Sequence, residues 1–285
     1  MKPRLKQLTR LSICKSETWN NFKADTNLTS DEYESALSGT VDHIIDPPYN
    51  TSFEGSGGVI AMLEPHVTSF CYVDGEFAEY EKCNGLLSQW RGYGAESGYA
   101  IEFDTQRLNA LVVQEEDNFH YGWKAFDEVI YDRGVDDLAT KFPLLVNAIE
   151  LNAPKILKQE YESVPLLFGP LVDAATRFKH PGFREENEVR MVFSPISQEV
   201  LERHHENDAT SGDRERHKQT KTPHFSESNK QFIKLFDSGG EKLPIRKIIV
   251  GPHKDKIQRK ENLLRFLRGN RIDIEVVCSE TPLLY

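Results

Sequence analysis

The sequence predicts an α+β protein, built as a single domain of residues 1–285 around a mixed sheet with several core helices. Three patterns predict this class: short β-forming runs between turn residues, apolar positions at helical spacing, and a final strand, helix and strand. At 285 residues, the chain can bury one substantial core and is near the upper size for one domain.

The first part of the chain predicts a weak helix within residues 19–39, followed by a loop. The run VTSFCY at 67–72 is rich in β-formers and ends at the turn pair Asp74-Gly75, so it predicts a strand. A second strand is expected at Tyr99–Phe103. Between the two strands, GLLSQWRGYGAES predicts a short helix that leads into a turn.

In the middle of the chain, apolar residues recur at helical intervals from 135 to 178. Prolines at 143, 154, 165 and 170 interrupt this pattern, so we expect two or three core-facing helices separated at these positions. Residues 197–230 are dense in charge and hydroxyl groups and cannot supply much core, so they predict a mobile polar insertion.

The C-terminal part regains regularity. It predicts a buried strand at Ile245–Val250, an amphipathic helix at Asp255–Leu267 and a closing strand at Ile272–Cys278, with Gly251 and Gly269 marking the breaks between them.

Composition excludes several classes. A net charge of -10, from 45 acidic and 35 basic residues, argues against a general nucleic-acid binder. The four cysteines form no C-x-x-C pair and the histidines match no zinc spacing, so we expect neither a metal site nor a disulfide framework. No stretch reaches the roughly 18 apolar residues of a membrane span. We therefore expect a soluble, cytoplasmic protein with no membrane partner.

The acidic segment, which we define as Phe183–Arg190 (FREENEVR), is the first candidate site. Strand alternation would place Glu186, Glu188 and Arg190 on one face. Two adjacent carboxylates beside a guanidinium can supply one base and one hydrogen-bond acceptor, a combination that sugar chemistry needs. The alternative is a solvated ladder of weak salt bridges on an edge strand.

Two further clusters could bind a ligand. In QWRGYG, a turn could present Trp90, Arg91 and Tyr93 to a planar ligand, or Trp90 and Tyr93 could pack in the core while Arg91 reaches solvent. Lys179 and His180 could contact an anion such as a pyrophosphate, although basic residues are also favoured at a helix end by the helix dipole.

Several segments together resemble the bacterial domain-of-unknown-function family 2971. The matching pieces lie within residues 65–282: TSFCY, LLSQWRGYGAESGYAIEFD, EVIYD, KHPGFREENEVRMVF, LPIRKIIVGPHKD and VVCSETP. The combination of SQWRGY with H-P-G-F-x-E-E-x-E-x-R is the specific part of this resemblance.

The order of elements after the acidic segment is similar to the C-terminal half of the ADP-ribosyltransferase fold. This resemblance implies an ADP-ribosyltransferase-like architecture and NAD as cosubstrate. It makes Glu188 the catalytic carboxylate, Glu186 the residue that orients the acceptor and Arg190 their supporting partner, and we add Ser69 as a ligand-binding candidate. A nucleic acid or a protein would be the acceptor.

The resulting hypothesis is an NAD-consuming effector of a bacterial stress or anti-phage defence system, acting with a cognate partner of that system. Family members usually begin with a His-Tyr-Thr or Tyr-Thr strand, which MKPRLKQLTRLSICKSETWNNF lacks. A non-enzymatic binding or regulatory module of a defence or toxin–antitoxin system therefore stays open. A hydrolase of glycosidic or nucleotide bonds that uses the same carboxylates also stays open.

Overall fold

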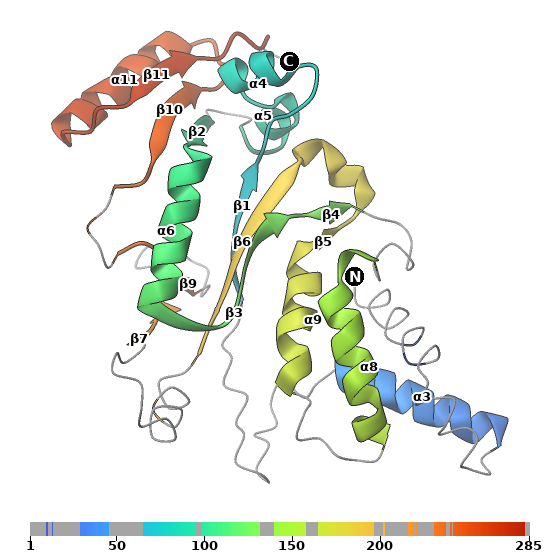
Figure 1. Cartoon of the computed structure of the whole chain (residues 1–285). Helices are drawn as coiled ribbons and strands as arrows, with labels where there is room; N and C mark the ends of the chain where they lie inside the picture. The colour runs from blue at the N-terminus through green and yellow to red at the C-terminus, as the bar shows by residue number, and fades with distance from the viewer. Residues whose placement is uncertain are drawn as a thin grey trace. The chain divides into compact units, whose positions relative to one another are not determined.

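The computed structural model describes residues 10, 13, 29–45, 65–94, 98–131, 140–157, 165–196, 202, 216–218, 220–221, 231–237, 240 and 242–282. Over these ranges the chain is a mixed α/β structure with small sheets and several helices (Figure 1). The coarse fold class is therefore confirmed, while the ADP-ribosyltransferase-like architecture stays a prediction.

The chain divides into two compact units. Unit 1 comprises residues 1–70, 120–184 and 189–219, and unit 2 comprises residues 71–119, 185–188 and 220–285. The chain passes repeatedly from one unit to the other, so neither unit is a continuous stretch of sequence. Whether the two fold as a single domain stays a prediction.

Unit 1 contains most of a four-stranded sheet with the order β1-β6-β3-β7. The strands are β1 (His66–Cys71), β3 (Phe119–Glu128), β6 (Glu188–Pro195) and β7 (Arg216–His217). β6 lies between β1 and β3, and Met191, Val192 and Phe193 are all buried in succession. Consecutive buried residues point to opposite faces of a strand, so both faces of β6 are covered.

Within the described part of unit 1, a hydrophobic core is built largely from α3 (Ser30–Ile45), α8 (Pro143–Leu157) and α9 (Pro165–Arg177). α8 and α9 lie side by side (Figure 1), and buried residues from all three helices meet in one cluster, including Leu37, Leu145 and Leu167. The expectation of two or three core helices in this part of the chain is confirmed for the residues the structure describes.

The prediction that all four prolines separate helices is wrong for two of them. Pro143 and Pro165 each occupy the first position of a helix, where proline is favoured because its missing N–H would have no partner there in any case. By contrast, α8 continues through Pro154 and α9 continues through Pro170, so these two residues do not separate helices. Packing of the apolar helix faces outweighs the local cost of proline.

Unit 2 contains a three-stranded sheet with the order β11-β10-β2. The strands are β2 (Tyr99–Phe103), β10 (Ile245–Val250) and β11 (Glu275–Cys278), and α11 (Lys256–Gly269) connects the last two. β10 pairs in parallel with β11 and antiparallel with β2. The predicted strand, helix and strand are confirmed, with two differences in their bounds: α11 includes Gly269 and is capped by Asn270, and the closing strand begins at Glu275 instead of Ile272.

The described part of unit 2 also contains α4 (Ala78–Asn84), α5 (Leu87–Tyr93) and α6 (Thr105–Asn118). The side chain of Asp104 caps α6 by accepting a hydrogen bond from the Arg107 N–H. The predicted strand at 99–103 and the short helix in SQWRGY are confirmed, and so is the turn at Gly75, whose φ is +82°.

The predicted polar insertion at 197–230 lies mostly outside the described residues. Within it the structure describes residues 202 and 216–218 and the short strand β8 (Thr220–Lys221), which pairs with β9 (Phe232–Ile233). The predicted helix at 19–39 is confirmed from Ser30 onward but continues to Ile45, where a loop was expected, and residues 19–28 lie outside the description. Among the residues described, no helix has the length and apolar character to cross a bilayer.

Candidate functional site

The acidic segment follows two residues that fold the chain locally. Lys179 ends β5 (Phe178–Lys179), and its ammonium lies 5.0 Å from the centre of the Phe183 ring. His180 accepts two backbone hydrogen bonds, from Gly182 to its ring Nδ1 and from Phe183 to its carbonyl, both at 3.0 Å. These contacts begin η1 (Pro181–Glu186), a 3₁₀ helix. Both predicted anion-binding residues therefore have local structural contacts.

The strand expected through Glu186 begins two residues later. Glu186 is the last residue of η1, Asn187 has a left-handed φ of +43°, and β6 starts at Glu188. The left-handed residue turns the chain and ends the alternation of side chains. The prediction that Glu186 shares one strand face with Glu188 and Arg190 is therefore wrong.

Asn187 is held to the residues just after β1. Its side-chain Nδ2 donates to the Tyr72 carbonyl at 3.0 Å and to Asp74 Oδ1 at 3.1 Å, while its own carbonyl accepts from Tyr72 N at 2.9 Å. The sequence analysis missed this residue. The available signal was that asparagine is among the few residues that tolerate the left-handed region.

Glu188 is the most deeply buried carboxylate of the acidic segment. It is 4% exposed and occupies the first position of the internal strand β6, whereas Glu186 is half-buried. A carboxylate removed from water interacts more strongly with nearby charge, because the surrounding dielectric constant is low. Buried ionisable groups are also enriched at functional sites, although structural networks contain them as well.

The acidic segment also contacts the helix that carries SQWRGY. The Ser88 hydroxyl, on α5, donates to the Glu185 carbonyl at 3.4 Å, and both residues belong to unit 2. Glu186 and Glu188 are in the same unit, as are Trp90, Arg91 and Tyr93. The remaining predicted site residues, Ser69, Lys179, His180 and Arg190, belong to unit 1.

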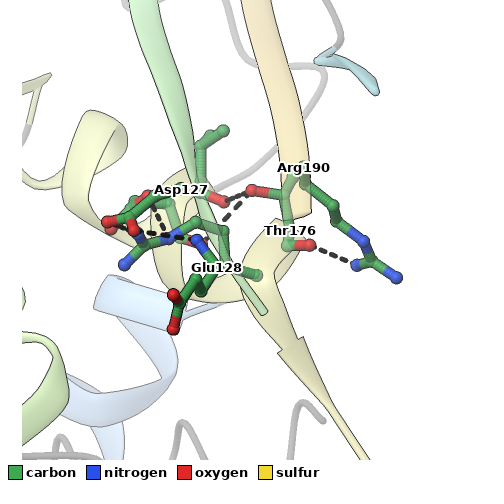
Figure 2. Close-up of polar contacts among 7 residues, drawn as sticks. Asp127, Glu128, Thr176 and Arg190 are labelled. Carbon is green, nitrogen blue, oxygen red and sulfur yellow. Dashed lines mark hydrogen bonds and ion pairs between the residues drawn. The ribbon is translucent and has the colours of Figure 1, made fainter. Parts of the chain in front are cut away.

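Arg190 fastens a helix to the sheet of unit 1. Its guanidinium donates from Nη1 to the carbonyl of Thr176, and Figure 2 shows the side chain directed at this oxygen. Thr176 is the penultimate residue of α9, where carbonyl groups have no partner within the helix. Arg190 therefore satisfies the end of α9, which gives it a structural role in addition to its predicted one.

A second polar contact joins the same helix end to the neighbouring strand. Asp127 on β3 is the cross-strand partner of Arg190, and its carboxylate forms an ion pair with Arg177. Arg177 Nε lies 2.9 Å from Asp173 Oδ1, and the guanidinium carbon lies 5.4 Å from the centre of the Phe142 ring. The i, i+4 spacing of Asp173 and Arg177 was the sequence signal that could have predicted this pair.

The environment of Asp173 changes its proton affinity. Burial raises the pKa of Asp173 and the nearby Asp127 carboxylate acts in the same direction, while the Arg177 guanidinium opposes them. Burial is the largest of these effects. The cluster thus contains two acids around one buried arginine, and Asp173 holds its proton to a higher pH than an ordinary aspartate does.

Trp90 packs in the core of unit 2. It is 8% exposed, and its Nε1 donates to the Asn84 carbonyl at 2.8 Å. Glycines surround the indole: a Cβ added at Gly85 would lie 2.6 Å from it, and one added at Gly94 or Gly251 would lie 2.9 Å from it. These glycines allow backbone from separate elements to approach the ring, so Trp90 presents no open face to a planar ligand.

Arg91 and Tyr93, which follow Trp90 on α5, are exposed where Trp90 is buried. Tyr93 is 76% exposed and Arg91 is also exposed, at the C-terminal end of α5. Ser69 is exposed on β1. Of the residues proposed for ligand contact, these three are therefore accessible on their own units.

Asn84 is another buried polar residue that the sequence analysis missed. Its carbonyl accepts from Trp90 Nε1 and from the Ser279 hydroxyl at 2.7 Å, and its Oδ1 accepts from Glu280 N at 2.6 Å. It thus joins the SQWRGY helix to Ser279 and Glu280 of the segment VVCSETP, directly after β11. In the described ranges, no three His, Cys, Asp or Glu side chains gather in a way that could hold a metal ion.

Comparison with known proteins gives a match to a family model over part of the chain. No curated protein and no solved structure matches the chain. Residues 89–191 match the family model described as "Protein of unknown function (DUF2971)", a shorter range than the residues 65–282 over which we noted the resemblance. The matched range includes QWRGY and the whole acidic segment, so this part of the chain is similar to that family of unknown function.

Proposed function

We propose that the chain is an NAD-consuming, ADP-ribosyltransferase-like enzyme in which Glu188 is the catalytic carboxylate. The observation that carries this proposal is the burial of Glu188, 4% exposed, at the first position of an internal strand. A fixed carboxylate in a low-dielectric environment stabilises positive charge that develops in a transition state without having to reorganise.

The chemistry follows from that position. In NAD, the bond between the ribose C1′ and the nicotinamide nitrogen breaks, and its electron pair leaves with nicotinamide. The ribose becomes oxocarbenium-like, and the Glu188 carboxylate stabilises its positive charge. An oxygen or nitrogen of the acceptor then forms the new bond to C1′, and Glu186, which is half-buried, takes the acceptor proton.

Two accessible residues supply ligand contacts in this proposal. Tyr93 offers an exposed aromatic face for a planar ring, and Arg91 offers a guanidinium for a phosphate. Trp90 is excluded from this role because it is buried among glycines. The role in the cell would be that of an effector in a bacterial stress or anti-phage response, since consumption of NAD stops growth.

The test measures nicotinamide release by the purified full chain mixed with NAD and, in turn, DNA, RNA and a protein mixture. Glu188→Gln should lower the rate by about 10²–10³-fold, because it removes the charge but keeps the shape. The matched control is Glu115→Gln. Glu115 is 1% exposed and accepts a hydrogen bond from Phe236 N at 2.8 Å, so it is a buried glutamate with a structural contact.

Glu115→Gln should lower stability but leave the rate per folded molecule within about threefold of wild type. Absence of nicotinamide release by the wild type with every acceptor would overturn the proposal and favour the binding module. Release by Glu188→Gln at the wild-type rate would overturn the assignment of Glu188. Free ADP-ribose as the product, detected by mass spectrometry, would identify hydrolysis, with water as the acceptor.

A further inference from the structure

Asn187 lies between Glu186 and Glu188 in the sequence, and its backbone conformation determines the relative directions of their side chains. Its φ of +43° ends η1 at Glu186 and lets β6 begin at Glu188. An L-residue in this region costs roughly 1–2 kcal/mol unless, like asparagine, it is suited to it. Here side-chain contacts accompany the unusual backbone conformation.

Those contacts use the whole donor capacity of the side chain. The amide NH₂ of Asn187 has two hydrogens, and it donates to the Tyr72 carbonyl and to Asp74 Oδ1, at 3.0 and 3.1 Å. The third contact runs the other way, from Tyr72 N to the Asn187 carbonyl at 2.9 Å. The residue is thereby fixed at both its side chain and its main chain.

The same three contacts fix the direction of both glutamates. The Asn187 carbonyl belongs to the peptide plane that leads into Glu188, so the bond from Tyr72 N restrains the orientation of that plane. The side-chain contacts restrain the Cα of Asn187, to which the plane from Glu186 is joined. All five residues involved, Tyr72, Asp74, Glu186, Asn187 and Glu188, belong to unit 2.

We infer that Asn187 is a positioning residue for the carboxylate site, which sets the relative placement of Glu186 and Glu188 without touching the substrate itself. This inference rests on the proposed function for its kinetic consequence, but its structural part can be tested without any activity. A displacement of about 1 Å at a catalytic group can cost on the order of 10²-fold in rate.

Asn187→Asp is the sharpest test. Aspartate has the same shape and also tolerates the left-handed region, but its carboxylate cannot donate to the Tyr72 carbonyl and would repel the Asp74 carboxylate. We expect kcat for nicotinamide release to fall about 10–100-fold, with KM for NAD within about threefold of wild type. Asn187→Gly keeps the backbone freedom but loses the side chain, so its kcat should lie between those of wild type and Asn187→Asp.

Asn118→Asp is the matched control. Asn118 Nδ2 also donates to a backbone carbonyl, that of Gln114 at 2.8 Å, at the end of α6. The same chemical change there should lower the thermal midpoint without changing kcat. If Asn187→Asp is folded and retains the wild-type kcat, the inference is overturned.

Amide NMR spectra separate this inference from the proposed function. If Asn187 positions both carboxylates, Asn187→Asp should shift the backbone signals of Glu186 and Glu188 and speed hydrogen exchange at Tyr72 N–H, whether or not the wild type releases nicotinamide. Unchanged signals for Glu186 and Glu188 would overturn the inference. If the wild type releases no nicotinamide but Asn187→Asp shows these shifts, the proposed enzymatic function is rejected and the positioning role of Asn187 is retained.

Discussion

Trp90 and the acidic segment both lie in the range that matches the family model, but they are held by different kinds of contact. The Trp90 indole is enclosed by glycine backbone, so its position depends on close packing around the ring. The acidic segment is held by hydrogen bonds at Ser88, Asn187 and Arg190. Shape errors in a packed core cost several kcal/mol, whereas single hydrogen bonds contribute about 1 kcal/mol each. The first region should therefore determine stability and the second should determine the proposed chemistry.

The largest effect on stability is expected at Gly85. An added Cβ would lie 2.6 Å from the Trp90 ring, and the backbone has φ +76° and ψ 167°, a combination that essentially only glycine adopts. We expect Gly85→Ala to lower the free energy of unfolding by about 2–6 kcal/mol, from strain and overpacking together. Urea unfolding followed by Trp fluorescence measures this change.

The control for Gly85 is Gly75, which has a similar φ of +82° but no atom within 4 Å of an added Cβ. Gly75→Ala should cost only about 1–2 kcal/mol, the backbone part alone. Equal losses in the free energy of unfolding for the two variants would show that contact with Trp90 contributes little. That result would contradict the proposed difference between the Trp90 region and the acidic segment.

A smaller effect is expected at Arg190, which belongs to the hydrogen-bonded region. Arg190→Met should lower the free energy of unfolding by about 1–3 kcal/mol, because it leaves the Thr176 carbonyl at the end of α9 without this partner. Arg184→Met is the comparison: Arg184 is exposed and donates to the Tyr131 carbonyl at 3.1 Å, so its loss should cost less than about 1 kcal/mol. A larger loss at Arg184 than at Arg190 would contradict this interpretation.

The smallest effect is a dependence of stability on pH through Asp173. Because burial raises its pKa, the folded chain binds this proton more tightly than the unfolded chain does. The contribution of protonated Asp173 to the free energy of unfolding is complete below the ordinary aspartate pKa of 3.8. It is lost as pH rises through the raised pKa of the folded chain. Wild type should therefore lose stability relative to Asp173→Asn across that window, as measured by urea unfolding at successive pH values.

Asp104 supplies a control of opposite sign for the pH experiment. The Arg107 N–H and the Arg246 guanidinium lower the pKa of Asp104. The advantage of wild type over Asp104→Asn should be present above 3.8 and lost as pH falls through the lowered value. The same pH trend for both aspartates would contradict the assigned role of burial at Asp173.

Much of the fold could be predicted from local patterns. The strands at 99–103 and 245–250 have the predicted bounds, and the strand at 67–72 is displaced by one residue, because alternation or continuous apolar runs with turns at both ends specify strands well. Pro143 and Pro165 were predicted to separate helices and each begins one, whereas the breaks predicted at Pro154 and Pro170 do not occur. Helix continuation through Pro170 depends on tertiary packing, which no local pattern records.

The candidate site was less predictable than the fold. Glu186 and Glu188 lie two residues apart, and only the left-handed φ of Asn187 prevents them from sharing a strand face. That conformation depends on Tyr72 and Asp74, more than 110 positions earlier in the chain. The burial of Trp90 likewise depends on Gly251, which a sequence pattern cannot connect with SQWRGY.

The interleaving of the two units bears on how the range that matches the family model can be isolated. The matched range 89–191 takes parts of both units, and it contains β2 but neither β10 nor β11, the other two strands of its sheet. A fragment cut at those boundaries would expose the hydrogen-bonding edge of β2 and would leave Trp90 without Asn84, Gly85 and Gly251. The matched range is therefore not a unit of folding, because residues outside it supply two of the three strands of one sheet and part of the packing around Trp90.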